Sequence, residues 1–299
     1  MKEYLESQLK GIGTVKKLRG EASTRNFFRV SLGNESLVAM VYPEENREEI
    51  DRIVRLTGLY KEHGLNVPEI KDVIGNRILL QEDLGNLLLQ AAYLGFNIEA
   101  AKKILERIAD MLLTLSRIPP SHTAAVLDTA RMKWEMDFFI THFVPHFSPV
   151  PGKIEKLRET LHGMVEKIGP SETFAHRDFH SRNMLYYKED IYLVDFQDSL
   201  KAPVYYDLVS FAFDSYVDFK SMRQRRFFMD ALEKRGMSID LEQFRLTALQ
   251  RNIKALGTFG FQIKVRKNFS YTKYIRRAIR HLSTNPLFDQ YLNLRLFEW

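Results

Sequence analysis

The hydrophobic pattern of this chain changes its period near residue 84, and this change limits the folds open to it. Before that point, five segments have strand-like composition, at 14–20, 27–32, 36–42, 69–74 and 77–83. Residues 46–63 lie among them and carry apolar side chains at helical spacing. After Gly85 the helical spacing dominates. The pattern therefore predicts a small β-rich lobe over residues 1–84 and a larger helical lobe over residues 85–299.

The second part of the chain is predicted to be helical with one short interruption. Its strongest segment is 98–118, where one face is apolar and Pro119-Pro120 follows. Further helices are expected near 130–142, at 153–168 and over most of the chain from Tyr205 onward. Two short strands, around 184–187 and 191–195, interrupt this helical part.

Composition excludes several kinds of chemistry. The 299 residues include no cysteine, which rules out disulfides, cysteine-ligated zinc, iron–sulfur clusters and a cysteine nucleophile. The first residues, MKEYLESQLK, are charged and do not form a secretory signal. The longest uncharged runs are shorter than the roughly 20 apolar residues that cross a bilayer. We therefore expect a cytoplasmic protein that does not associate with a membrane.

Positive charge is concentrated near the end of the chain. The net charge is +6, yet from Arg245 onward eleven lysines and arginines face only two acids. Such a region can bind nucleic acid, serve an anionic substrate or form a solvated helix face. The solvated face is the default interpretation unless a site requires the charges, and we expect no nucleic-acid partner.

One eight-residue segment, HRDFHSRN at 176–183, points to phosphoryl transfer. It matches the pattern H-R-D-x-x-x-x-N, and Asp195 follows at the end of an apolar strand with Phe196 behind it, as in D-F-G. In this chemistry an aspartate orients the acceptor hydroxyl or takes its proton, while an asparagine and a second aspartate hold Mg²⁺. The pattern predicts Asp178 as the base, Asn183 and Asp195 as metal ligands, and His176 as a brace of the loop.

The order of these motifs resembles the aminoglycoside phosphotransferase/choline kinase family. The resemblance implies an α+β, bilobal, protein-kinase-like fold with a five-stranded antiparallel sheet, and it implies ATP and Mg²⁺ as cofactors. Residues 20–26 resemble the loop that covers the nucleotide phosphates, and residues 80–85 resemble the hinge that receives adenine. The nucleotide-binding residues implied in this way are Ser23, Thr24, Arg25, Gln81, Glu82 and Leu84.

Within that family, three segments are similar to the bacterial anomeric kinases of N-acetylmuramate and N-acetylglucosamine. They are HRDFHSRN, VDFQDSLKAPVYYDLVSFAFDSY and LQRNIKALGTF. The similarity implies an ATP-dependent sugar kinase of cell-wall recycling that phosphorylates the anomeric hydroxyl of a small amino sugar. Its acceptor contacts are predicted to come from His180, Gln197, Asp198, Arg251 and Lys254. The last two are three residues apart and share one helix face.

Two departures from the kinase pattern leave alternatives open. The segment Val38-Ala39-Met40-Val41 places valine where protein kinases have the lysine of V-A-x-K. Either another cation replaces it, with Arg25 the nearest candidate, or the metal does more of the work. Gln197 stands where D-F-G has glycine. The alternatives are an aminoglycoside-modifying enzyme, a choline- or ethanolamine-type kinase, and a non-catalytic nucleotide-binding module. Oligomeric state and pathway do not follow from the sequence.

Overall fold

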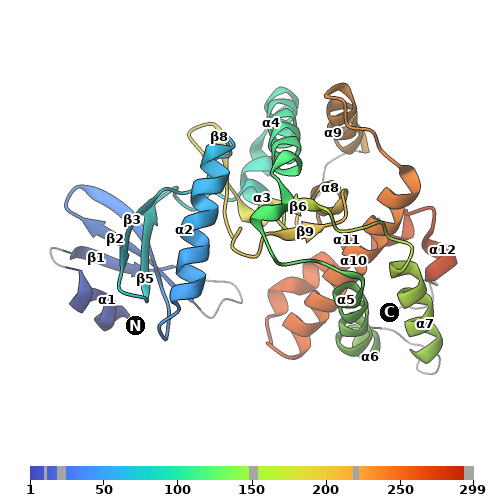
Figure 1. The fold of residues 1–299 in the computed structure, drawn as a ribbon, viewed down its shortest axis with the longest axis horizontal. Coiled ribbons are helices and arrows are strands. Elements are labelled where there is room, and N and C mark those ends of the chain that lie inside the picture. Colours follow the sequence, from blue (N-terminus) through green and yellow to red (C-terminus); the bar gives the residue numbers. More distant parts are fainter. Residues whose placement is uncertain (10–11, 19–24, 148–153, 218–221, 293–299) are drawn as a thin grey trace. The chain divides into compact units, whose positions relative to one another are not determined.

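The computed structural model describes residues 1–9, 12–18, 25–147, 154–217 and 222–292 (Figure 1). The chain divides into two compact units. The N-terminal unit comprises residues 1–89 and 183–197, and the helical unit comprises residues 90–182 and 198–299. The division into domains 1–84 and 85–299 stays a prediction.

A five-stranded antiparallel sheet forms the centre of the N-terminal unit as far as this unit is described, with the strand order β1-β2-β3-β5-β4. The turn between β2 and β3 contains Gly33 at a φ of 61°, a conformation that glycine adopts readily. The elements are α1 (Lys2–Gln8), β1 (Ile12–Lys17), β2 (Asn26–Leu32), β3 (Glu35–Val41), α2 (Arg47–Glu62), β4 (Ile70–Ile74) and β5 (Ile78–Glu82).

The two faces of this sheet differ because successive side chains of a strand point to opposite sides. Strands β2 and β3 pair without a break from Asn26↔Val41 to Leu32↔Glu35. One face buries a cluster that includes Ala39 and Val41 together with Leu5 of α1. The neighbouring residue Met40 belongs to the opposite face. A valine at position 41 therefore packs in the core on the α1 side of the sheet.

A second, separate pair of strands completes the N-terminal unit. Strands β7 (Met184–Tyr187) and β8 (Asp190–Leu193) form a hairpin, which confirms the predicted insertion. The amide of Leu193 donates to the carbonyl of Asn66 and the amide of Tyr186 donates to the carbonyl of Leu87, both at 2.8 Å. These bonds join the hairpin to the N-terminal unit although it follows the first helices of the helical unit in sequence.

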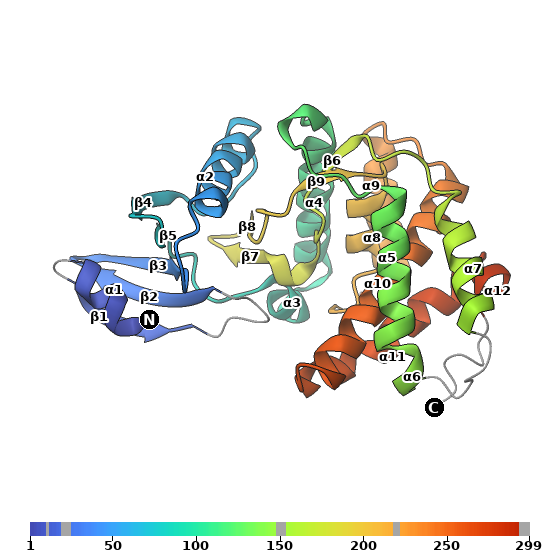
Figure 2. The same cartoon turned by 60° about the horizontal axis from the view of Figure 1, so that its bottom comes forward.

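The helical unit surrounds the long helix α10. Helix α5 packs against it (Figure 2), and a Cβ added to Gly257 of α10 would lie 2.9 Å from the Cα of Phe139 in α5. Glycine therefore permits the two helices to approach closely. The helices are α3 (Leu89–Ala92), α4 (Ile98–Arg117), α5 (Thr129–His142), α6 (Val144–Phe147), α7 (Ile154–Val165), α8 (Tyr206–Ala212), α9 (Met222–Lys234), α10 (Leu241–Lys264), α11 (Thr272–Ser283) and α12 (Phe288–Tyr291).

Short elements connect these helices. Strands β6 (Thr173–Ala175) and β9 (Leu200–Ala202) pair with each other and were not predicted, since three residues carry no measurable period. The 3-10 turns are η1 (Tyr93–Gly95), η2 (Pro120–His122), η3 (Ser181–Asn183) and η4 (Phe269–Tyr271). None of the helices in the described residues is long and apolar enough to cross a membrane. The predicted α+β class, with an antiparallel sheet followed by a mainly helical part, is confirmed.

Candidate active site

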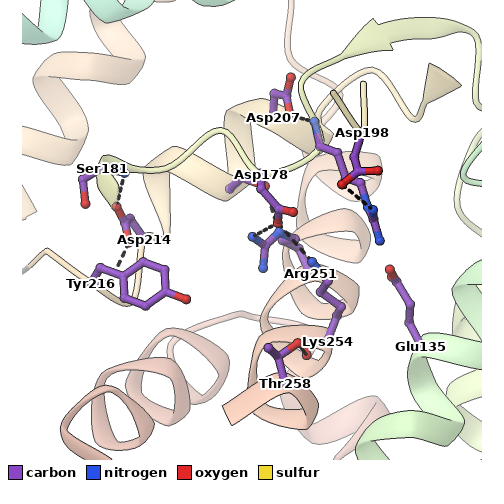
Figure 3. A network of polar contacts seen from close by, with 12 residues as sticks. Glu135, Asp178, Ser181, Asp198, Asp207, Asp214, Tyr216, Arg251, Lys254 and Thr258 are labelled. Atoms are coloured by element: carbon purple, nitrogen blue, oxygen red, sulfur yellow. Dashed lines mark hydrogen bonds and ion pairs between the residues drawn. The ribbon is translucent and has the colours of Figure 1, made fainter. Parts of the chain in front are cut away.

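The H-R-D loop lies between β6 and η3, and two carboxylates further along the chain hold its backbone. Asp207 of α8 accepts hydrogen bonds from the amides of His176, at 2.6 Å, and Arg177, at 3.0 Å. Asp214 accepts one from the amide of Ser181 at 2.8 Å (Figure 3). Neither carboxylate was predicted to hold this loop. Burial raises the pKa of Asp207 to about 7, against the pull of its two amide bonds.

We expect Asp207→Asn to lower the free energy of unfolding by about 1–3 kcal/mol, the cost of leaving a buried donor unsatisfied. The carboxylate accepts one bond on each oxygen, whereas an asparagine turns an N–H group toward one of the two loop amides. Denaturant unfolding measures the loss. Asp240→Asn is the matched control, because Asp240 accepts both of its amide bonds on one oxygen, which asparagine retains. Equal losses in the two variants would contradict the assignment.

Two cations from α10 contact the carboxylate of Asp178 (Figure 3). The Nη2 atom of Arg251 lies 3.2 Å from Oδ1 of Asp178, and Nζ of Lys254 lies 3.1 Å from the same oxygen. Burial opposes ionisation of Asp178, but Lys254 and Arg251 outweigh it and hold its pKa well below the ordinary carboxyl range. A carboxylate of this kind can orient a hydroxyl and accept its proton only as that proton becomes acidic during transfer.

Two further buried polar groups belong to this cluster and had not been predicted. Glu135 reaches toward it from α5 and accepts a hydrogen bond from Nε2 of Gln250 at 2.7 Å (Figure 3). The hydroxyl of Tyr206 is buried and has no hydrogen-bond partner among the described residues. Its ring centroid lies 6.0 Å from the guanidinium carbon of Arg251. Tyr206 stands beside Asp207 in a segment that the sequence had singled out, whereas nothing in the sequence distinguished Glu135.

The predicted metal ligands flank the β7–β8 hairpin. The amide of Val194 donates to the carbonyl of Asn183 at 3.0 Å, so the strand ends that carry Asn183 and Asp195 are adjacent. The side chain of Asp195 is 49% exposed. No group of three or more His, Asp or Glu residues with metal-binding geometry occurs in the part of the chain that is described. One carboxylate and one amide oxygen fit Mg²⁺, which typically takes one or two protein carboxylates and completes its shell with water and phosphate.

A pocket in the N-terminal unit opens beside Asp195. It is lined by Arg25, Phe27, Met40, Ile53, Pro68, Gln81, Val194, Asp195, Phe196 and Gln197. Its walls therefore come from β2, β3, α2 and β5, together with the segment that follows β8. Two predicted nucleotide-binding residues, Arg25 and Gln81, meet in this pocket with the predicted metal ligand Asp195.

The other predicted nucleotide-binding residues have different surroundings. Ser23 and Thr24 lie outside the described residues. Leu84 is 2% exposed. The amide of Glu82 donates to the carbonyl of Glu69 at 2.8 Å. None of Glu82, Leu84 and Glu69 lines the pocket described above.

The predicted hinge is anchored to β2 through Asp83. Nε and Nη2 of Arg29 donate to the two carboxylate oxygens of Asp83 at 2.6 and 2.7 Å. Asp83 also accepts a bond from the amide of Gly85, whose φ of 77° favours glycine. Burial opposes ionisation of Asp83, yet the bond from Arg29 and the other donors lower its pKa. This two-bond ion pair ties the residue that follows β5 to β2.

The remaining predicted acceptor residues contact other parts of the candidate site. Gln197 donates from Nε2 to Oδ1 of Asp195 at 2.9 Å. Asp198 is exposed, and its Oδ2 lies 3.9 Å from Nη1 of Arg177. The ring of His180 lies 4.9 Å from that of Tyr216, centroid to centroid, and burial lowers the pKa of His180.

Three tyrosine rings surround the guanidinium of Arg182, the residue before Asn183. The guanidinium carbon lies 4.7 Å from the ring centroid of Tyr216, 5.5 Å from that of Tyr271 and 5.7 Å from that of Tyr274. Such distances are typical of cation–π contacts. An arginine of the chain itself thus occupies this aromatic cage and fixes the end of the H-R-D loop.

Comparison with proteins of known sequence gives consistent matches. A model of the phosphotransferase enzyme family matches residues 14–246. The N-acetylmuramate/N-acetylglucosamine kinase of Pseudomonas aeruginosa is 26% identical over 280 residues, which cover 88% of this chain and 81% of that protein. The protein of the same name from Neisseria meningitidis is 24% identical, over 80% of this chain and 76% of its own.

Solved structures of phosphotransferases share the fold. A choline kinase from Streptococcus pneumoniae superposes with a TM-score of 0.65 at 16% identity, over 95% of this chain and 97% of that one. A spectinomycin phosphotransferase solved with ADP and spectinomycin gives a TM-score of 0.67 at 14% identity, over 94% and 97% of the two chains. These neighbours confirm the predicted protein-kinase-like fold, and those solved with ADP support nucleotide use. The chain is an enzyme that transfers phosphate to a hydroxyl acceptor, and it belongs to the phosphotransferase enzyme family.

Proposed function

We propose that this enzyme transfers the terminal phosphate of ATP, with Mg²⁺, to the anomeric hydroxyl of N-acetylmuramate or N-acetylglucosamine, in the cytoplasm and in the service of cell-wall recycling. Asp178 orients the acceptor hydroxyl and takes its proton. His176 positions the loop through its amide bond to Asp207. Asn183 and Asp195 hold the metal, which neutralises charge on the phosphates. Two relatives that carry the name N-acetylmuramate/N-acetylglucosamine kinase support the choice of acceptor.

The observation that carries the acceptor class is the pair of cations on Asp178. Arg251 and Lys254 both contact its carboxylate, so the acceptor hydroxyl is received next to positive charge. Cations at this point suit a neutral sugar or one with a carboxylate, and they disfavour a polycationic aminoglycoside. Choline is disfavoured for a separate reason, because Arg182 already fills the tyrosine cage.

A panel of acceptors tests this proposal. Phosphate transfer from ATP is measured with N-acetylmuramate, N-acetylglucosamine, kanamycin and choline, and the product is identified by phosphorus NMR. The methyl glycoside of N-acetylglucosamine is the key control, since its anomeric oxygen is blocked while its other hydroxyls are free. We expect transfer to both amino sugars and none to the glycoside. Efficient use of kanamycin or choline, without activity on either sugar, would overturn the acceptor assignment.

We expect Arg251→Ala to raise KM for N-acetylmuramate more than KM for N-acetylglucosamine. A charge-assisted contact to the lactyl carboxylate, worth roughly 1.5–3 kcal/mol, is lost only for the acidic sugar. The value of kcat should fall for both sugars, since Arg251 also holds Asp178. Steady-state kinetics with each sugar measure the split, and Lys264→Ala, which removes an exposed cation from the same helix, is the control. An equal rise in both KM values would remove Arg251 from sugar discrimination.

A further inference from the structure

Strand β3 places no cation in the nucleotide pocket. Ala39 and Val41 face the apolar core on the α1 side of the sheet, and Met40 is the β3 residue that lines the pocket. In protein kinases the lysine of this strand pairs with the nucleotide phosphates and with a glutamate of the following helix. In β3 of this protein, the side chain that faces the pocket is the thioether of Met40. Val41, which stands at the lysine position of V-A-x-K in the sequence, therefore faces the core, while its neighbour Met40 lines the pocket on the opposite face.

Arg25 brings a cation to the same place from a different element. It precedes β2, and its Nη1 lies 3.7 Å from the sulfur of Met40. The same Nη1 is 3.2 Å from Oε1 of Glu49, while Nη2 is 3.3 Å from Oδ1 of Asp195. The Arg25 side chain is only 10% exposed. One guanidinium thus bridges the first turn of α2 and the proposed metal-binding aspartate.

Glu49 is itself held in place by the cap of α2. The side chain of Asn46 accepts a hydrogen bond from the amide of Glu49 at 3.2 Å, and its Nδ2 donates to Oε2 of Glu49 at 3.0 Å. This reciprocal arrangement resembles a capping box, except that Glu49 accepts from the side chain of Asn46 and not from its backbone amide. One carboxylate oxygen of Glu49 is therefore bound to the helix cap, and the other pairs with Arg25. The position of Glu49 is set by local structure and does not depend on Arg25.

We propose that Arg25 is the phosphate-binding cation of this enzyme and that Glu49 is the positioning residue that holds it, so that together they replace the strand lysine and its helix glutamate. The inference rests on the proposed use of ATP. A guanidinium can keep one edge on Glu49 and turn the other edge from Asp195 to a phosphate, because its five N–H groups form a planar fork. Arg25 and the metal therefore compete for Asp195, because a carboxylate paired with Arg25 binds a divalent cation less tightly.

The sharing of Asp195 gives the two variants opposite effects on metal binding. Arg25→Met should weaken ADP binding by roughly 10–100-fold, as expected for loss of a charge-assisted phosphate contact. The same variant should bind Mn²⁺ alone more tightly than wild type, because Asp195 loses its competitor. Glu49→Gln should weaken ADP binding several-fold and also weaken binding of Mn²⁺ alone, because Arg25 then pairs more fully with Asp195. A role in packing alone cannot produce opposite signs for the metal.

Calorimetry with ADP and electron paramagnetic resonance with Mn²⁺ measure these affinities on the full chain. Glu48→Gln is the matched control, since Glu48 lies in the same helical turn, is 88% exposed and pairs with Arg52. In the double variant, Glu49→Gln should add nothing to Arg25→Met, because a positioning residue acts only through its partner. If Glu49→Gln does not fold, Arg25→Met and Arg25→Lys still test whether Arg25 is the phosphate-binding cation. Glu49→Asp, whose side chain is shorter, then tests whether Glu49 positions it.

The outcomes separate this inference from the proposed function. ADP affinity within a few-fold of wild type in Arg25→Met would overturn the role of Arg25. Additive effects in the double variant, or a fall in Mn²⁺ affinity in Arg25→Met, would overturn the pairing with Glu49 and Asp195. In each case wild-type kinase activity would remain, and the proposed function with it. A wild-type enzyme that neither binds ADP nor transfers phosphate would instead overturn the proposed function.

Discussion

Replacing Asp178 with asparagine is expected to lower kcat by roughly 10²–10⁴-fold, the range for loss of a positioned proton acceptor. Asparagine retains an oxygen toward Arg251 and Lys254 but cannot take a proton. Affinity for nucleotide should stay near that of wild type, because Asn183, Asp195 and the pocket belong to the N-terminal unit. Single-turnover kinetics and ADP calorimetry on the same preparation measure the two quantities. A kcat within a few-fold of wild type would remove Asp178 from this role.

Stability has to be measured beside activity in this variant. Breaking a fully buried ion pair can cost about 3–5 kcal/mol and a surface pair contributes about 1 kcal/mol or less. Asp178 is 30% exposed and pairs with two cations, so we expect a loss of stability between these limits. Asp110→Asn is the control, because Asp110 pairs with Arg235 on the surface of the same unit and should change neither kcat nor stability much. The pKa of Asp178 is lowered in the folded protein, so its ion pairs stabilise the fold above its unfolded pKa of about 3.9. That contribution is lost as the pH falls below this value.

Replacing Asp195 with alanine is expected to abolish the Mg²⁺ dependence of nucleotide binding. The proposed metal site has one carboxylate and one amide as protein ligands, so that losing Asp195 leaves it Asn183, and neutral amides hold Mg²⁺ poorly. Calorimetric titration with ADP, with and without Mg²⁺, should give the same affinity in Asp195→Ala and different affinities in wild type. Asp72→Ala, which removes an exposed carboxylate from β4 of the same unit, serves as the control. A variant that still gains affinity from Mg²⁺ would place the metal elsewhere.

Strongly periodic segments and the short chemical motif were predictable from the sequence. Helix α4 and strands β2 and β3 appear within a few residues of their predicted bounds, because their periods of 3.6 and 2 extend over many residues. The pair Arg251 and Lys254 was also predictable as one helix face, and the structure shows both on Asp178. These features depend on residues close together in the sequence, so one sequence is enough to predict them.

The features that were not predicted are of two kinds. Some are contacts between residues far apart in the sequence, and others depend on which face of a strand a residue occupies. Asp207 and His176 are bonded across 31 positions, and Asp214 and Ser181 across 33, distances over which no period operates. The pairing of Arg25 with Glu49 needs the fold of a whole sheet and helix to bring it about. Val41 and Met40 illustrate the other limit, since neighbouring residues of a strand face opposite sides and a motif alone does not say which faces the pocket.

Two residues of the candidate site adopt left-handed backbone conformations that L-amino acids usually avoid. Arg177, which precedes the proposed base Asp178, has a φ of 77°, and Asp195, itself a proposed metal ligand, has a φ of 63°. A conformation of this kind costs a non-glycine residue on the order of 1 kcal/mol or more. Glycine would relieve that cost but would remove the guanidinium or the carboxylate. Stability and activity therefore conflict at these two positions. We expect selection for thermal stability alone to replace Arg177 and Asp195, for example with glycine, before other residues of the site.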